Sequence, residues 1–211
     1  WRQGARETLL KRASASPMFT LRTEARVLRL NLDGRRVNGL TYNRQGALRQ
    51  VKARREVILC AGAIETPQIL ELSGIGQARH LARLGIDVVH DLPGVGENAH
   101  DHLHTRLSFR CRGAVTLNQI MRNPLRKALM AARFALRGNG LISCSGQISH
   151  ALLKSAPDRD RADVKIQLHW LSSPDARDPK KMVFDDYPGI SIGTFPLRPK
   201  SRGSVHIRTA D

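Results

Sequence analysis

The stretch "REVILCAGAIETPQILELSGIG", from Arg55 to Gly76, decides how this chain is interpreted. Its apolar run "EVILCAG" is typical of a strand buried on both faces of a parallel α/β sheet. A helix is then predicted from Thr66, which would serve as the N-cap, with Pro67 at the first helical position. Its inward face would carry three apolar residues: Ile69, Leu70 and Leu72. A buried strand, a small-residue turn and a helix in this order indicate an α/β domain.

The turn itself, Ala61-Gly62-Ala63, is compatible with a chemical role as well as with a structural one. The start of a helix presents free backbone N–H groups and the positive end of the helix dipole, which together attract phosphate and other anions. Small residues let such a ligand approach the backbone closely. On the residues alone, contact with an anionic ligand and a purely structural turn both stay open.

Upstream of this stretch the pattern predicts one helix and a small antiparallel meander. Helical spacing covers residues 5–16 and ends at Pro17. Alternation at Phe19 and Leu21 predicts a strand, and Asp33-Gly34 is a hairpin signal between two longer strands. Strands at 37–42 and 48–53, with a turn at 43–46, would complete the meander.

Downstream, a second helix is predicted over 78–86 and a short strand at Val88–His90, followed by a Gly/Pro-rich connection over 91–104. The pattern then changes, and we place a boundary near residue 105. One amphipathic helix is predicted over 125–138, and strands at 107–110, 164–171, 189–197 and 201–208. Strands with few helical crossovers favour an antiparallel α+β unit in this second half.

The charge of the chain is strongly positive, with 35 Lys+Arg against 18 Asp+Glu and a formal net charge of +17. The basic residues are scattered and aromatic residues make up only 4%, so a solvated, arginine-rich surface is favoured over a nucleic-acid interface. Three widely spaced cysteines, Cys60, Cys111 and Cys144, are typical of reduced residues rather than a disulfide framework or a zinc site. We expect a cytoplasmic bacterial protein, and association with a membrane stays open.

The stretch "GAIETPQILELSGIG", Gly62–Gly76, resembles the second signature of the glucose–methanol–choline (GMC) flavoprotein oxidoreductases. Its flanks resemble the choline-dehydrogenase-like branch of that family in the same order. They are "TEARVLRLNLDGRRVNGLTY" before the motif, and "GIDVVHDLPGVGENAHDHL" and "PLRPKSRGSVHIR" after it. The resemblance therefore covers essentially the whole chain.

This resemblance implies an α/β plus α+β protein. Residues 1–105 would be the C-terminal part of a truncated, Rossmann-like FAD-binding domain, and residues 106–211 the first part of an antiparallel-sheet substrate domain. It implies oxidation of a small alcohol, choline-like or another, by hydride transfer to FAD while a base removes the hydroxyl proton. It also implies that the backbone of Val27 contacts the adenine end and that Ala61 and Gly62 pack near the dinucleotide. Asn98 belongs to a connector that retains Asp101 and His102 but departs from the family at Ala99 and His100.

Two features of the family have no counterpart in these 211 residues. No Gly-x-Gly-x-x-Gly phosphate loop is present, and the catalytic histidine with its His or Asn partner would lie beyond Asp211. Because the chain starts at Trp1 and a predicted strand runs to its end, we expect an internal fragment that neither binds FAD tightly nor turns over. A catalytically inactive paralogue and a basic binding module on the same scaffold remain as alternatives, and the sequence does not fix the electron acceptor or the oligomeric state.

Several histidines are candidates for a metal site or for the substrate cavity, on weaker grounds than the glycine turn. In "HDHLH", alternation along a strand would put His100, His102 and His104 on one face beside Asp101, as a metal site requires. A structural connector is favoured, because part of this motif matches a family that uses no metal, so we predict no metal site. His169 and His206 lie on strand patterns, where they would face either the substrate cavity or the core.

Overall fold

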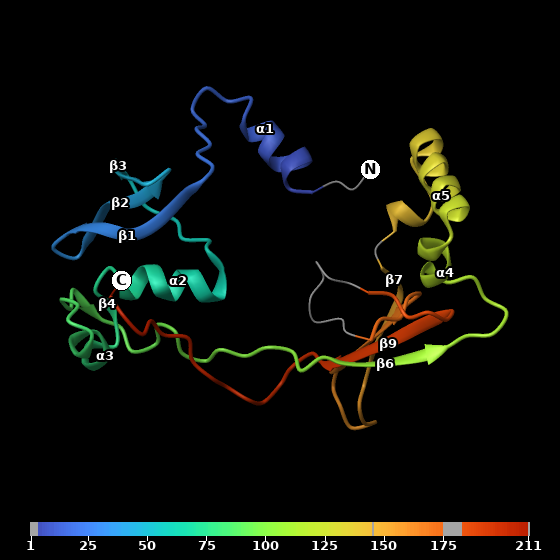
Figure 1. Ribbon diagram of the computed structural model, residues 1–211. Helices are drawn as coiled ribbons and strands as arrows, with labels where there is room; N and C mark the ends of the chain where they lie inside the picture. Colours follow the sequence, from blue (N-terminus) through green and yellow to red (C-terminus); the bar gives the residue numbers. More distant parts are fainter. Residues whose placement is uncertain (1–3, 145, 175–182, 211) are drawn as a thin grey trace. The chain divides into compact units, whose positions relative to one another are not determined.

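The computed structural model describes residues 4–144, 146–174 and 183–210. Its contacts divide the chain into two compact units (Figure 1). We call Leu9–His100 with Ser201–Asp211 the meander unit, and Trp1–Thr8 with Asp101–Lys200 the four-stranded unit. The last segment, predicted to belong with the second half of the chain, therefore lies with the meander unit.

The chain begins with the predicted helix, which consists of a π-helical turn (Arg6–Leu10) and α1 (Lys11–Ala13). The strand predicted at Phe19 and Leu21 is wrong, because these residues are exposed and pair with no neighbouring strand in the described structure. The three-stranded antiparallel meander is confirmed, in the order β1 (Ala25–Asp33), β2 (Arg36–Arg44) and β3 (Ala47–Lys52). Gly34, with φ +56°, makes the tight turn between β1 and β2.

The buried strand predicted at "EVILCAG" is also wrong. Residues 56–60 have no strand assignment, and the Ile58 side chain is 75% exposed. A central strand needs hydrogen-bonded neighbours on both sides, and no described strand pairs with this segment. The apolar run is therefore extended without being part of a sheet.

Helix α2 (Gly62–Glu71) begins one turn earlier than predicted. Its N-cap is Ala61 rather than Thr66, and Pro67 lies inside the helix rather than at its first position. A proline there removes only the bond to the carbonyl of Ala63, one turn back. The buried inward residue is Ile69, and α2 packs along β1 (Figure 1).

The segment "SGIG", residues 73–76, follows α2 and forms hydrogen bonds to β1 and to residues 89 and 90. The buried Ser73 hydroxyl donates to the carbonyl of Ile69 (2.5 Å) and accepts from the N–H of Leu30 (2.8 Å), which joins α2 to β1. The carbonyl of Gly74 accepts from Val89 and His90. The elements that follow are β4 (Ile75–Gly76), α3 (Ala78–Arg83) and β5 (His90–Asp91), with β4 and β5 paired in parallel.

The four-stranded unit contains one antiparallel sheet in the order β6-β9-β8-β7. Its strands are β6 (Thr105–Arg110), β7 (Gln147–Leu153), β8 (Val164–His169) and β9 (Gly189–Pro196). Between β6 and β7 lie α4 (Leu117–Arg122), α5 (Pro124–Arg137) and a 3₁₀ turn (Leu141–Ser143). The predicted helix and the antiparallel sheet are confirmed here.

The strand predicted over 201–208 is reduced to one antiparallel bridge between Gly203 and Ala99. This bridge and a bond from the N–H of Val205 to the carbonyl of Gly96 hold the segment in the meander unit. None of the helices in the described parts of the chain has the length and apolar character needed to cross a membrane.

Candidate functional site

The turn at Ala61 and Gly62 leaves the start of α2 open. Gly62 has φ +86°, a conformation that favours glycine, and a Cβ atom placed there would meet nothing within 4 Å. Ala61 gives the helix no side-chain cap, so the N–H groups of its first turn have no side-chain partner at the N-cap. An exposed glycine turn at a helix start without a side-chain cap fits the approach of an anionic ligand.

The other two predicted contact residues lie in the same unit. Val27 is half-buried on β1, which is an edge strand of the described meander, and the register shifts directly after it. An edge strand leaves one row of backbone polar groups available for a ligand. Asn98 is exposed with φ +60°, a left-handed conformation that asparagine tolerates better than most residues.

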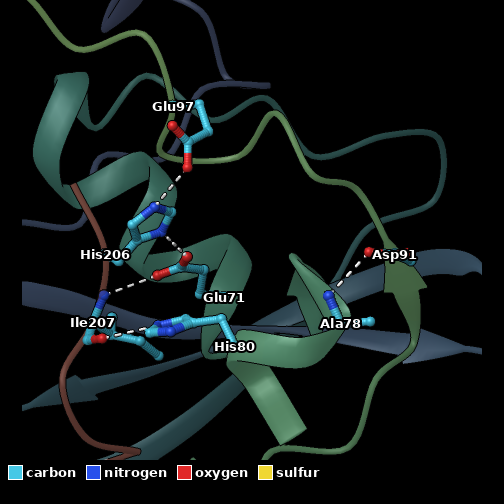
Figure 2. A network of polar contacts seen from close by, with 7 residues as sticks. All are labelled: Glu71, Ala78, His80, Asp91, Glu97, His206 and Ile207. Atoms are coloured by element: carbon cyan, nitrogen blue, oxygen red, sulfur yellow. Dashed lines mark hydrogen bonds and ion pairs between the residues drawn. The ribbon is translucent and has the colours of Figure 1, made fainter. Parts of the chain in front are cut away.

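The same unit contains a polar network that the sequence did not predict (Figure 2). Its centre is Glu71, the last residue of α2, which is completely buried. The Oε1 atom of Glu71 lies 2.6 Å from Nδ1 of His206, and its Oε2 atom accepts from the N–H of Ile207 at 2.9 Å. The other ring nitrogen of His206 lies 3.0 Å from Oε1 of Glu97.

The imidazole of His206 is thus held between two carboxylates. The hydrogen bond with Glu71 raises the pKa of His206 above its ordinary value, against the opposing effect of burial, and the bond with Glu97 raises it further. A proton on each ring nitrogen satisfies both carboxylates. When it is protonated, the imidazole neutralises a carboxylate that would otherwise be buried without a counter-ion.

Glu71, His80 and His206 also place possible metal-ligand atoms within 4.8 Å of one another. The 2.6 Å between Glu71 and His206 is, however, a hydrogen-bond distance, shorter than the roughly 3.3 Å between two ligands of a tetrahedral zinc ion. Nε2 of His80 lies 3.1 Å from the carbonyl oxygen of Ile207. In this arrangement Glu71 and His206 form an ion pair that His80 supports through Ile207.

This network connects the segments that carry the candidate contacts. Glu71 ends the helix that begins at Gly62, and Glu97 precedes Asn98 in the chain. His206 and Ile207 bring in the last segment, which also pairs with Ala99. Through His206, the network therefore holds the loop that contains Glu97 and Asn98 close to the C-terminal end of α2.

In the four-stranded unit, His169 is the most unusual polar residue. It is buried on β8, and its Nε2 atom has no hydrogen-bond partner in the described structure. Burial, followed by the charges of Arg106 and His104, lowers the pKa of His169, so its imidazole is neutral at physiological pH. A Cβ at Gly193 would lie 2.5 Å from Nε2 of His104 and 3.6 Å from Nε2 of His169, so glycine makes room for both rings.

The histidines of "HDHLH" take structural roles. The ring of His102 stacks on Phe195, and the backbone N–H of His102 donates to Oδ1 of Asp101. The ring of His104 tilts against the same Phe195. Nδ1 of His100 lies 3.4 Å from the carbonyl oxygen of Asn98. These contacts support the connector interpretation of the motif.

Comparison with known proteins identifies the family. Residues 1–104 match the family model described as GMC oxidoreductase. Oxygen-dependent choline dehydrogenase 1 of Chromohalobacter salexigens is 34% identical over 199 residues, which cover 94% of this chain and 35% of that protein. The chain thus spans about a third of the length of the curated relatives it matches.

Solved structures show the same fold. The chain superposes on an FAD-dependent oxidoreductase from Chaetomium thermophilum with a TM-score of 0.79 and 22% identity, covering 98% of this chain and 41% of that one. It superposes on a formate oxidase of Aspergillus oryzae with a TM-score of 0.78 and 21% identity, covering 89% and 37%. At these identities the likeness establishes the fold and leaves the substrate open.

Proposed function

We propose that this chain, which belongs to the GMC oxidoreductase family, is part of an FAD-dependent enzyme that oxidises the CH–OH group of a small alcohol. The observation that carries the proposal is the open glycine turn at Gly62, within the stretch that resembles the family signature. In this proposal the meander unit belongs to the cofactor domain and the four-stranded unit to the substrate domain. The relatives named choline dehydrogenases favour a choline-like alcohol.

The chain's own residues would bind and orient the cofactor. The backbone of Val27 would contact the adenine end, and the turn at Ala61 and Gly62 would approach the dinucleotide, where the N–H groups and dipole of α2 favour negative charge. Asn98 would complete the site from the loop held by Glu97 and Ala99. When bound, FAD supplies the acceptor for the hydride that leaves the alcohol carbon.

We further infer that these 211 residues alone do not turn over an alcohol, because they contain no Gly-x-Gly-x-x-Gly phosphate loop. Neither His169 nor His206 is assigned as the catalytic base. His206 is engaged by two carboxylates, and His169 is buried with its Nε2 atom facing the packed Gly193.

The test uses the complete product of the gene, which is expressed in bacteria and desalted. We expect a visible flavin spectrum after desalting and bleaching of that spectrum when choline or another small alcohol is added without oxygen. A flavin spectrum that no alcohol bleaches would support an inactive paralogue. A protein that stays colourless with added FAD would contradict the proposal.

A further inference from the structure

Helix α5 (Pro124–Arg137) is capped at both ends by residues of its own segment. Asn123 caps it by accepting from the N–H of Arg126 at 3.0 Å, and Pro124 occupies its first turn. Gly138, with φ +63°, closes it in the left-handed conformation. Within its unit the helix contacts α4 and the 3₁₀ turn (Figure 1). None of its residues is fully buried.

One face of α5 is apolar and exposed. Leu125, Leu129 and Leu136 are 79%, 69% and 85% exposed, and their spacing places them on the same side of the helix, with Ala132 between them. Leucines gathered in this way on one helical face, unlike single exposed leucines, mark a surface that binds something.

The charge on and around this helix has one sign. Four of its residues are basic and none is acidic: Arg126, Lys127, Arg133 and Arg137. The imbalance extends well beyond α5, because residues 102–157 contain nine Lys+Arg and no Asp or Glu. The high net charge is therefore not evenly scattered, and the partner of α5 is expected to be negatively charged.

We propose that α5 is a membrane-surface helix that docks this protein on a bilayer containing anionic lipid. The leucine face would enter the boundary between head groups and acyl chains, and the flanking arginines would bind lipid phosphates. At 14 residues the helix is about 21 Å long, which suits a helix that lies flat on a bilayer rather than one that crosses it.

Charge and composition favour this occupant over two others. A second copy of the chain docked through the same face would bring two sets of arginines together, at a cost in electrostatic repulsion. A nucleic acid would not use the leucines, since single strands stack on aromatic residues and Phe134 is the only aromatic residue of α5.

The test is co-sedimentation of the protein, as its gene encodes it, with lipid vesicles. We expect binding to vesicles of phosphatidylcholine mixed with phosphatidylglycerol, weak binding to phosphatidylcholine alone, and weaker binding as salt is raised. Replacing Arg126, Arg133 and Arg137 together by glutamine should weaken binding about a hundredfold, at roughly fivefold for each charge near the surface.

A matched pair of leucines tests the apolar contribution. Leu129 on α5 and Leu48 on β3 are both 69% exposed. Leu129→Glu should abolish vesicle binding without lowering the temperature of unfolding, and Leu48→Glu should change neither. No binding to anionic vesicles, or equal loss in both variants, would overturn the proposal. A drop in unfolding temperature or a change of oligomeric state for Leu129→Glu alone would show that protein covers this face, and would also overturn it.

Discussion

The Nδ1 atom of His206 lies 2.6 Å from Oε1 of Glu71, although the two residues are 135 positions apart in the sequence. Because Glu71 is completely buried, this contact supplies the counter-charge for a carboxylate that has left water. Ile207 and Glu97 complete the arrangement. These contacts bind the last described segment of the chain to the C-terminal end of α2, the helix whose first residue is Gly62 in the candidate cofactor turn.

The contact makes stability depend on pH. The pKa of His206 is raised in the folded protein above its ordinary value of 6.5, so the folded state binds the proton more tightly than the unfolded state. The resulting stabilisation is fully present below about 6.5 and is lost as the pH rises through the folded pKa. We expect the difference in unfolding temperature between the wild type and His206→Asn to shrink over that range. A difference that does not change with pH would contradict this account.

Removal of the buried carboxylate should be costly. Glu71→Ala leaves His206 without its closest partner and the N–H of Ile207 without an acceptor, so we expect the free energy of unfolding to fall by about 2–4 kcal/mol. Glu65→Ala, an exposed position of the same helix, is the control and should cost less than about 0.5 kcal/mol. Urea unfolding of both variants measures the difference, and similar losses for the two would refute the role of Glu71.

Two glycines with similar backbone conformations should respond differently to alanine. Gly74 has φ +78° and a Cβ there would lie 2.4 Å from the carbonyl oxygen of Asp87, whereas Gly85 has φ +71° and open space. Both substitutions incur strain of about 1–2 kcal/mol, and Gly74→Ala adds a steric clash of about 1–3 kcal/mol. Thermal unfolding should therefore rank Gly74→Ala well below Gly85→Ala. The reverse order would show that the close approach at Gly74 relaxes easily.

Asn118 should be the corresponding anchor of the four-stranded unit. Its buried side chain accepts from the N–H of Ser172 at 3.1 Å and donates to the carbonyl of Ser172 at 3.0 Å and to that of Asp185 at 3.3 Å. Asn118→Ala leaves buried backbone groups unpaired and should cost about 2–4 kcal/mol of unfolding free energy. The exposed Asn139→Ala is the control. Equal unfolding free energies for the two variants would contradict the assignment.

Local signals predicted much of the fold. Asp33-Gly34 gave the correct hairpin because a tight turn depends on its own residues. Helix α5 was predicted within one residue at each end, since its spacing, proline and glycine all lie within the segment. The apolar run at 56–60 misled because strand formation depends on neighbouring strands that the run itself does not reveal.

The candidate site was predicted only in its local part. The glycine turn was visible at Ala61-Gly62, and whether it contacts FAD stays a prediction. The Glu71 network was missed because it joins three distant segments of the chain. One signal was present: Glu71 interrupts the apolar residues Leu70 and Leu72, and a carboxylate among inward-facing residues of a helix requires a partner.

The most direct test of the cofactor site is an FAD titration that compares Gly62→Val with Gly46→Val in the protein as its gene encodes it. The two glycines have φ +86° and +81°, and a Cβ at either position meets nothing within 4 Å, so both variants incur the same backbone strain. If FAD approaches the turn before α2, Gly62→Val will lose FAD binding and Gly46→Val, in the β2–β3 hairpin, will keep it. Equal FAD affinity in the two variants would contradict the proposed cofactor site.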